Sequence, residues 1–143
     1  MLIIGKLEGM KNLLKTGFSV LFSGLVFVSC EDIEYQTVES IGRIKIDSVK
    51  IMKDTMNVNT IQSIKTYSTY PSQCEGFYGY DYIHDSNLQR SVTAYKYTAE
   101  GPCALEAHVG TSQINFSPRQ KGSYTFKFWS SGTNWISKTI VVE

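Results

Sequence analysis

The feature that most constrains the fold of this chain is a strict alternation of side-chain types in residues 124–129. Aromatic side chains at Tyr124, Phe126 and Phe128 alternate with Thr125 and Lys127. A period of two is typical of a β-strand that buries one face, because successive side chains point to opposite sides of the sheet. No segment after residue 30 shows the apolar spacing of a long helix. The chain beyond that point is therefore predicted to be all-β.

Six further segments are rich in β-branched and aromatic residues and are bounded by turn-forming residues. The seven predicted strands lie within residues 41–51, 60–70, 76–83, 90–98, 112–117, 124–129 and 135–142. About seven short strands with turn signals between them are typical of an antiparallel β-sandwich. We therefore predict this fold class for the domain.

The apolar positions within these segments predict which faces are buried. Ile44 and Ile46 are out of phase with Val49 and Ile51, which predicts a bulge or a switch of strand near Asp47-Ser48. In the second segment, the residues expected to be buried are Ile64, Tyr67 and Tyr70.

Two segments have aromatic faces. In residues 76–83, the tyrosines Tyr78, Tyr80 and Tyr82 are expected on one face, opposite Phe77, Gly79, Asp81 and Ile83. In residues 90–98, alternation places Val92 and Ala94 on one face and Tyr95 and Tyr97 on the other.

The N-terminal 29 residues have the pattern of a secretory signal peptide. Lys11 and Lys15 form a cationic head, and residues 17–28 form a short apolar core. The core is interrupted by Gly and Ser and is shorter than the roughly 20 apolar residues that span a bilayer, which disfavours the alternative of a permanent transmembrane anchor. We predict a helical signal peptide over residues 1–29, with translation starting at Met10.

Ser29 and Cys30 resemble the lipobox of bacterial lipoproteins, in which a small residue precedes a Cys that becomes acylated. The resemblance implies cleavage before Cys30 and a lipid anchor on Cys30 in the outer membrane; a plain signal peptide cut nearby is the alternative. The acidic residues 31–34 are similar to a surface-export signal of some Gram-negative lipoproteins, or form a solvated tether. The expected organisation is a tether over residues 30–40 and a folded domain over residues 41–143.

The charge balance restricts the classes of partner. The chain has 14 Lys and Arg against 13 Asp and Glu. A nucleic-acid-binding domain is expected to show a basic excess or stripe, and this sequence has none. We therefore predict no nucleic-acid partner.

The segment Phe116-Ser117-Pro118 … Lys121-Gly122-Ser123-Tyr124 resembles the corner between strands E and F of immunoglobulin-like and fibronectin-like domains. In those domains a Tyr near the start of strand F bonds back to the backbone a few residues upstream. The resemblance implies this role for Tyr124 and an immunoglobulin-like sandwich. Because no Cys lies in the Tyr124 strand, the cysteines do not match the inter-sheet pair of antibody domains.

Cys74 and Cys103 lie 29 positions apart, each in a turn-like setting between predicted strands. After export they would face an oxidising compartment, where disulfides persist. We predict that they pair and clamp the ends of the unit 74–103, which leaves Cys30 for lipidation. The spacing fits neither a zinc site nor a Cys-x-x-Cys redox pair.

The sequence predicts no catalytic residue, no cofactor and no metal site. The two histidines, His84 and His108, are not accompanied by a Gly-x-Ser-x-Gly motif, and we expect both at loops or strand ends. A carboxylate at Asp81, within an aromatic strand, must be exposed or paired. We expect it to pair with Arg90, with a ligand contact as the alternative.

The aromatic load is the only feature that indicates binding. The candidate surface comprises Tyr78, Tyr80, Tyr82, Tyr95, Tyr97, Trp129 and Trp135. Aromatic side chains provide rigid contact area with a polar group, which suits a protein or sugar partner. Strands favour the same residue types for structural reasons, so a purely structural role is the alternative.

These observations predict a lipid-anchored, non-catalytic binding module of the cell envelope, with an envelope protein or a glycan as partner. The alternative is a structural component of a larger envelope complex, which an exposed hydrophobic edge strand would favour. A secreted inhibitor or enzyme is less favoured; an enzyme would need a cleft with clustered titrating groups, and the sequence shows no such cluster.

Overall fold

The computed structural model describes residues 37–143, which form nine β-strands and no helix. In chain order they are β1 (Val38–Ile44), β2 (Ser48–Ile51), β3 (Thr55–Met56), β4 (Gln62–Tyr70), β5 (Glu75–His84), β6 (Gln89–Ala99), β7 (His108–Phe116), β8 (Gly122–Ser131) and β9 (Asn134–Val142). The all-β prediction is confirmed for this part of the chain. The signal peptide, Cys30 and the tether up to residue 36 lie outside the described residues.

All seven predicted segments form strands. The segment 41–51 divides into β1 and β2, and the other six correspond to β4 through β9. The short strand β3 has no counterpart among the predicted segments; it pairs in parallel with β9, where Thr55 is opposite Val141.

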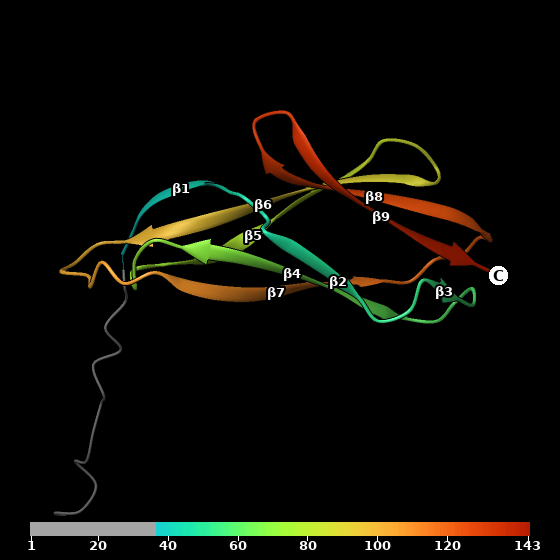
Figure 1. The fold of residues 1–143 in the computed structure, drawn as a ribbon, viewed down its shortest axis with the longest axis horizontal. Helices are drawn as coiled ribbons and strands as arrows, with labels where there is room; N and C mark the ends of the chain where they lie inside the picture. The colour runs from blue at the N-terminus through green and yellow to red at the C-terminus, as the bar shows by residue number, and fades with distance from the viewer. Residues whose placement is uncertain (1–36) are drawn as a thin grey trace, which may run out of the picture. The chain divides into compact units, whose positions relative to one another are not determined.

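The strands form two sheets that stack in a sandwich-like arrangement (Figure 1). Sheet A has the order β1-β6-β8-β9-β3, and β5 pairs with β6. Sheet B consists of β2, β4 and β7, with β4 in the centre. The N-terminal part of β6 pairs in parallel with β8, because β7 crosses to sheet B between them and the chain returns in the same direction. The prediction of purely antiparallel sheets is therefore wrong at the β6–β8 and β3–β9 pairings.

The chain switches sheets between β1 and β2, where the apolar pattern shifts by one residue. The backbone N–H of Ile46 donates to Trp129 in sheet A over 3.1 Å, and the next N–H, of Asp47, donates to Tyr67 in sheet B over 2.8 Å. The Asp47 carboxylate accepts hydrogen bonds from the backbone N–H and the hydroxyl of Thr69, both over 2.8 Å. The predicted switch is confirmed, and Asp47 fixes its position.

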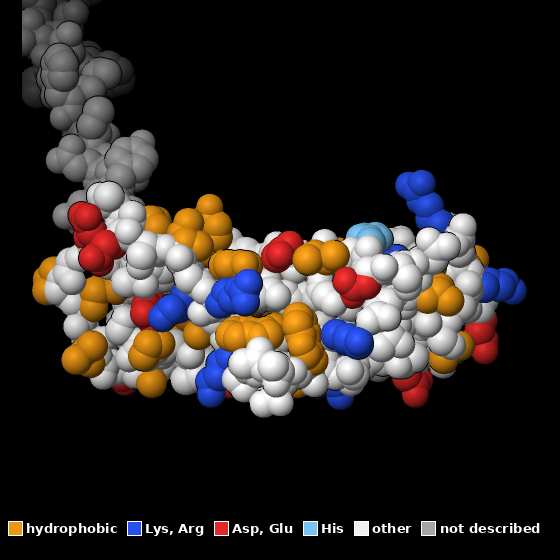
Figure 2. All heavy atoms as spheres, turned by 90° about the horizontal axis from the view of Figure 1, so that it is seen from above, with side chains coloured by type: hydrophobic (Ala, Val, Ile, Leu, Met, Phe, Trp, Pro, Cys, Tyr) orange, Lys and Arg blue, Asp and Glu red, His pale blue; other side chains and the backbone are white. Residues whose placement is uncertain are grey.

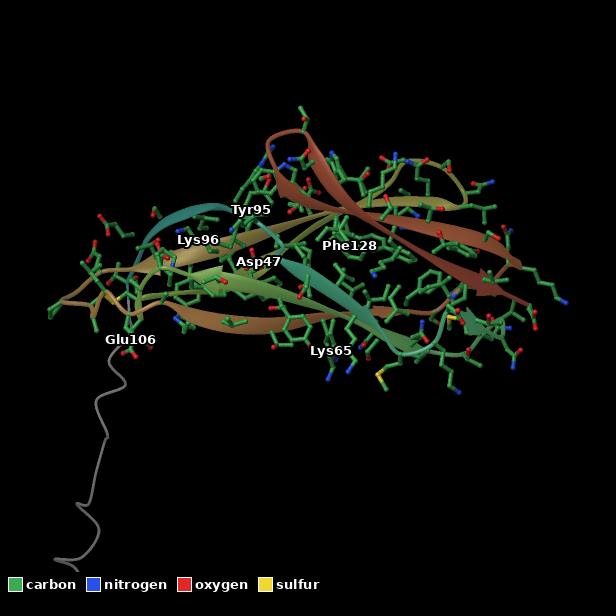
Figure 3. All side chains as sticks on the ribbon, viewed as in Figure 1. Asp47, Lys65, Tyr95, Lys96, Glu106 and Phe128 are labelled. Atoms are coloured by element: carbon green, nitrogen blue, oxygen red, sulfur yellow. A yellow bond between two sulfur atoms is a disulfide. The ribbon has the colours of Figure 1, made fainter. Side chains whose placement is uncertain are left out.

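The core lies between the sheets and is built from alternate strand positions. Tyr124, Phe126 and Phe128 of β8 are all buried, as their alternation predicts. The Phe116 ring of β7 packs edge-on against Phe126, with 4.9 Å between ring centroids. Figure 3 shows Phe128 between the two sheets. The other buried hydrophobic side chains are Ile44, Ile46, Met56, Ile64, Tyr70, Val92, Ala94, Ala99, Ile140 and Val142.

Strand β4 corrects one of the predicted core positions. Ile64 and Tyr70 are buried as predicted, but Tyr67 is only half-buried, on the outer face of sheet B. The strict alternation of β4 places Thr66 and Ser68 inside instead. The hydroxyl of Thr66 is satisfied there by the hydroxyl of Tyr80, 2.6 Å away.

Strand β5 corrects the predicted aromatic face. Its pairing with β6 contains a bulge between Phe77 and Gly79. Because a bulge inserts one residue into the strand, it reverses the side on which later residues point. Phe77 therefore packs against the core together with Tyr80 and Tyr82, while Tyr78 is exposed.

Cys74 and Cys103 form a disulfide, as predicted, with their Cα atoms 5.6 Å apart. The bond joins the residue before β5 to the segment that leads into β7. It clamps the ends of the β5–β6 unit, as the spacing of the cysteines predicts.

The corner before β8 has the predicted hydrogen bond. The Tyr124 hydroxyl donates to the carbonyl oxygen of Gln120 over 3.0 Å. Between them, Gly122 has a φ of +147°, a conformation that L-residues rarely adopt. A Cβ at this position would also lie 2.8 Å from the Leu88 side chain.

Candidate functional site

The seven aromatic residues predicted to form one surface divide between three places. Four of them lie on the outer face of sheet A, where they are opposite one another or opposite exposed side chains of β1; these are Tyr95, Tyr97, Trp129 and Trp135. Tyr78 is exposed at the bulge of β5. Tyr80 and Tyr82 point inward, between the sheets.

Cross-strand pairing brings the two tyrosines next to side chains of β1 and the two tryptophans next to each other. Tyr95 is opposite Arg43 and Tyr97 is opposite Ile41, while Trp129 is opposite Trp135. We call these six residues the aromatic face. Figure 2 looks down on this side of the molecule and shows hydrophobic side chains gathered near its middle, interspersed with Lys and Arg side chains. In Figure 3, Tyr95 lies on the outer side of the sheet.

Two contacts hold the tryptophan part of the aromatic face in place. The Trp129 indole N–H donates to the carbonyl oxygen of Gly132 over 3.0 Å, so the ring is tied to the β8–β9 hairpin. The Arg43 guanidinium lies 5.9 Å from the Trp129 ring centroid, within cation–π range. Trp135 is 42% exposed and Ile41 is 49% exposed. Tyr95, Tyr97 and Trp129 are half-buried, so the face is ordered by internal contacts while Trp135 and Ile41 remain open to solvent.

A glycine beneath Tyr97 gives the ring room to lie along the sheet. Gly76 of β5 is opposite Tyr97, and a Cβ at Gly76 would lie 2.7–2.8 Å from three atoms of the Tyr97 phenol. Gly79 is opposite Tyr95, but a Cβ there would meet nothing within 4 Å. The close approach at Gly76 flattens this part of the aromatic face.

A groove lies along the other side of β5, between the edges of the two sheets. It has a volume of about 870 Å³ and is lined by side chains of β5 and β7, the β5–β6 loop and the segment before β8. Tyr80 and Tyr82 line it from β5. Burial raises the pKa of both hydroxyls above the usual value for Tyr, although hydrogen bonds with Thr66 and Ser112 oppose this at Tyr80 and the charge of Arg90 opposes it at Tyr82. Both phenols are therefore neutral donors or acceptors at physiological pH.

Arg90 lies at the floor of the groove and does not pair with Asp81. Arg90 is buried on the same face of β6 as Val92 and Ala94 and points inward, whereas Asp81 is exposed and lies opposite Thr93. The predicted ion pair is therefore wrong, because the two side chains lie on opposite faces of sheet A. The guanidinium instead donates to the carbonyl oxygens of Ser86, Gln89 and Asn87, at 2.6, 2.9 and 3.1 Å. It also lies 5.5 Å from the Tyr124 ring centroid.

The two histidines occupy strand ends, as predicted. His84 ends β5 and is exposed, with its ring 5.4 Å from that of Tyr82. His108 begins β7 and stacks on the buried Tyr70, with ring centroids 5.2 Å apart. Residues 37–143 contain no group of three or more His, Cys, Asp or Glu side chains placed to hold a metal ion.

Sequence reasoning missed the groove and the role of Arg90. Neither has a local signal, because the groove forms where β5 of sheet A approaches β7 of sheet B. The close packing beneath Tyr97 has one sequence clue, which is Gly76, since Gly within a strand often marks close approach of another group.

Comparisons with known proteins gave no match: no family model, no curated protein and no solved structure is similar to this chain. Within residues 37–143, no helix has the length and apolar character needed to cross a membrane.

Proposed function

We propose that this protein is a lipid-anchored, non-catalytic binding module of the cell envelope, and that the aromatic face is its contact surface. The observation that carries the proposal is the gathering of Tyr95, Tyr97, Trp129, Trp135 and Arg43 on one outer sheet face. Tyr, Trp and Arg are the residue types enriched at the energetic centres of protein interfaces. Aromatic rings also suit the apolar faces of sugars, so the partner is an envelope protein or a glycan.

The rigidity of the aromatic face supports binding rather than mere exposure. A side chain that is already ordered loses little conformational entropy when a partner covers it. The hydrogen bond from Trp129 to Gly132 and the close packing of Tyr97 on Gly76 provide such order. Isolated exposed apolar side chains need no explanation, but a contiguous group of this kind supports an interaction site.

The anchor and the fold family are also part of the proposal. The Cys74–Cys103 disulfide leaves Cys30 as the remaining cysteine of the chain, which supports lipidation there in the outer membrane, with or without exposure at the cell surface. The hydrogen bond from Tyr124 to Gln120 supports an immunoglobulin-like sandwich, since it is the corner bond of that family.

The test is binding of the purified protein to isolated envelopes that lack it. Trp135→Ala is expected to weaken binding about tenfold, as truncation of a central interface aromatic does. The matched control is Val109→Ala, which removes another exposed apolar side chain, 64% exposed, from an outer position on β7. Protease treatment of the envelopes identifies a protein partner, and periodate treatment identifies a glycan. Equal binding by both variants and the parent protein contradicts the assignment.

A structural role in a larger envelope complex is the second candidate, and the edges of the sheets favour it. Within residues 37–143, strand β7 has one unpaired edge and carries the exposed Val109, and β5 has one unpaired edge and carries the exposed Ile83. Unpaired edges with apolar side chains pair readily with other chains. In the experiment above, loss of binding with Val109→Ala but not with Trp135→Ala supports this candidate instead.

A further inference from the structure

The groove between β5 and β7 is bordered by two unpaired strand edges. Within residues 37–143, β5 pairs only with β6, and β7 pairs only with β4. Such edges present a row of backbone N–H and C=O groups that can pair with an added strand. Here an added strand would cover the groove between the free edges of β5 and β7.

The groove between β5 and β7 is closed at one end and accessible to solvent at the other. At the closed end, the Tyr80 hydroxyl bonds to Thr66 over 2.6 Å, and His108 stacks on Tyr70. The groove of about 870 Å³ extends from Tyr80 toward the β5–β6 loop, past Tyr82 and Phe116. This volume lies in the upper part of the range for sites that bind small ligands. The interior of the groove is thus accessible to side chains of a segment laid along β7.

The charge of the groove is positive and lacks a counter-charge. Its lining includes Arg90 and Arg119, and no Asp or Glu. The Arg90 side chain is 7% exposed, its Nε has no hydrogen-bond partner, and within residues 37–143 no carboxylate lies within 4.0 Å of its nitrogens. A buried charge without an opposite charge costs free energy, because carbonyl oxygens stabilise a guanidinium without neutralising it. A ligand carboxylate in the groove would reduce this cost.

We propose that the groove binds an extended acidic peptide, which adds a strand to the free edge of β7 and places a carboxylate near Arg119 and Arg90. Strand addition gains backbone hydrogen bonds along the edge, and alternate side chains of the added strand enter the groove. Tyr82 and Phe116 contact the apolar ones, while Arg119, which is exposed at the rim, meets the carboxylate. A small carboxylate or an acidic sugar would account for the arginines but not for the unpaired edges.

This inference shares the β7 edge with the second candidate function and does not depend on the aromatic face. Selection from a random dodecapeptide phage library on the full-length protein tests it. We expect enriched peptides to be rich in Asp and Glu. Arg119→Gln is expected to weaken their binding about fivefold or more, and Arg119→Lys to retain most of it, because the charge is kept. Trp135→Ala, on the aromatic face, is expected to leave peptide binding unchanged.

The strand pairing itself has a distinct signature. In an added strand, only every second N–H of the peptide faces β7. N-methylation of an enriched peptide, one residue at a time, is therefore expected to abolish binding at alternate positions and to be tolerated between them.

Four results would overturn the proposal. They are no enrichment above background, enriched peptides whose binding is unaffected by Arg119→Gln, an N-methylation scan without a period of two, and a dimer of this protein that Arg119→Gln dissociates. The last result would make a second copy the occupant of the groove.

Discussion

Two glycines of β5 provide a matched pair for testing how the aromatic face is built. Gly76 and Gly79 lie on the same strand, each opposite a tyrosine of β6, and neither has a positive φ. Replacing a strand Gly by Ala restricts the unfolded chain and stabilises a protein by about 0.4–1 kcal/mol where the new methyl group fits. At Gly79 the Cβ meets nothing within 4 Å, so Gly79→Ala is expected to gain about 0.5 kcal/mol.

At Gly76 the same substitution meets the Tyr97 ring at 2.7–2.8 Å, closer than real Cβ contacts. The half-buried ring must then swing away, which costs about 0.5–1.5 kcal/mol for a displaced rotamer and about 0.2–1 kcal/mol of cross-strand contact. Gly76→Ala is therefore expected to be about 1–2 kcal/mol less stable than Gly79→Ala.

Urea denaturation of the two variants and the parent protein measures these differences, with an unchanged slope showing that the same surface is exposed on unfolding. Because Tyr97 belongs to the aromatic face, Gly76→Ala is also expected to weaken envelope binding. Equal stability of the two variants would show that Tyr97 does not pack on Gly76, and the flat aromatic face would be refuted.

Three further predictions concern the framework. Replacing Cys74 and Cys103 together by Ala is expected to lower the free energy of unfolding by about 3–4 kcal/mol, measured by urea denaturation, and no loss would contradict a clamp. Tyr124→Phe removes the hydroxyl that bonds Gln120 and should cost about 0.5–1.5 kcal/mol; a neutral result in thermal melts would show the corner bond to be dispensable. Burial raises the pKa of Asp47, but hydrogen bonds from Thr69 and Lys45 outweigh it and hold that pKa below the usual value. The stability gained from Asp47 is thus complete above the unfolded pKa of about 3.9 and lost as pH falls through the lower folded value. Asp47→Asn should therefore be less stable than the parent at pH 7, with the difference vanishing in acid; a difference independent of pH would refute this.

The parts of the fold that follow from local alternation could be predicted from the sequence. Strand β8 has its aromatic residues at every second position, and all three are buried. The change of sheet at Asp47 was also predictable, because the apolar residues on either side of it are out of phase. In both cases the signal lies within a few residues of the feature that it predicts.

The bulge in β5 shows where local alternation fails. Phe77, Tyr78 and Gly79 give no sign that one residue is inserted, so the sequence alone assigns the later tyrosines to the wrong side. Tyr80 and Tyr82 thus line the groove rather than the aromatic face. The mistaken pairing of Asp81 with Arg90 likewise arose because the side of the sheet on which each residue lies was not known.

The composition of the candidate site depends on strand order, which the sequence does not specify locally. Trp129 meets Trp135 through a hairpin, and this contact was within reach of sequence analysis. Arg43 joins them only because β1 and β8 both pair with the same edge of β6, opposite the edge that β5 occupies. The groove likewise depends on β5 and β7, which are separated in the sequence by β6, coming together in space.

Site-specific photo-crosslinking in intact cells tests most directly whether the aromatic face is the contact surface. A photo-crosslinking amino acid replaces Trp135 in one variant and Val109 in another, since both positions are exposed and lie on the outer faces of different sheets. The account predicts a discrete adduct with an envelope protein or a glycan from position 135 and none from position 109. An adduct from position 109 alone would contradict it and assign the contact to sheet B.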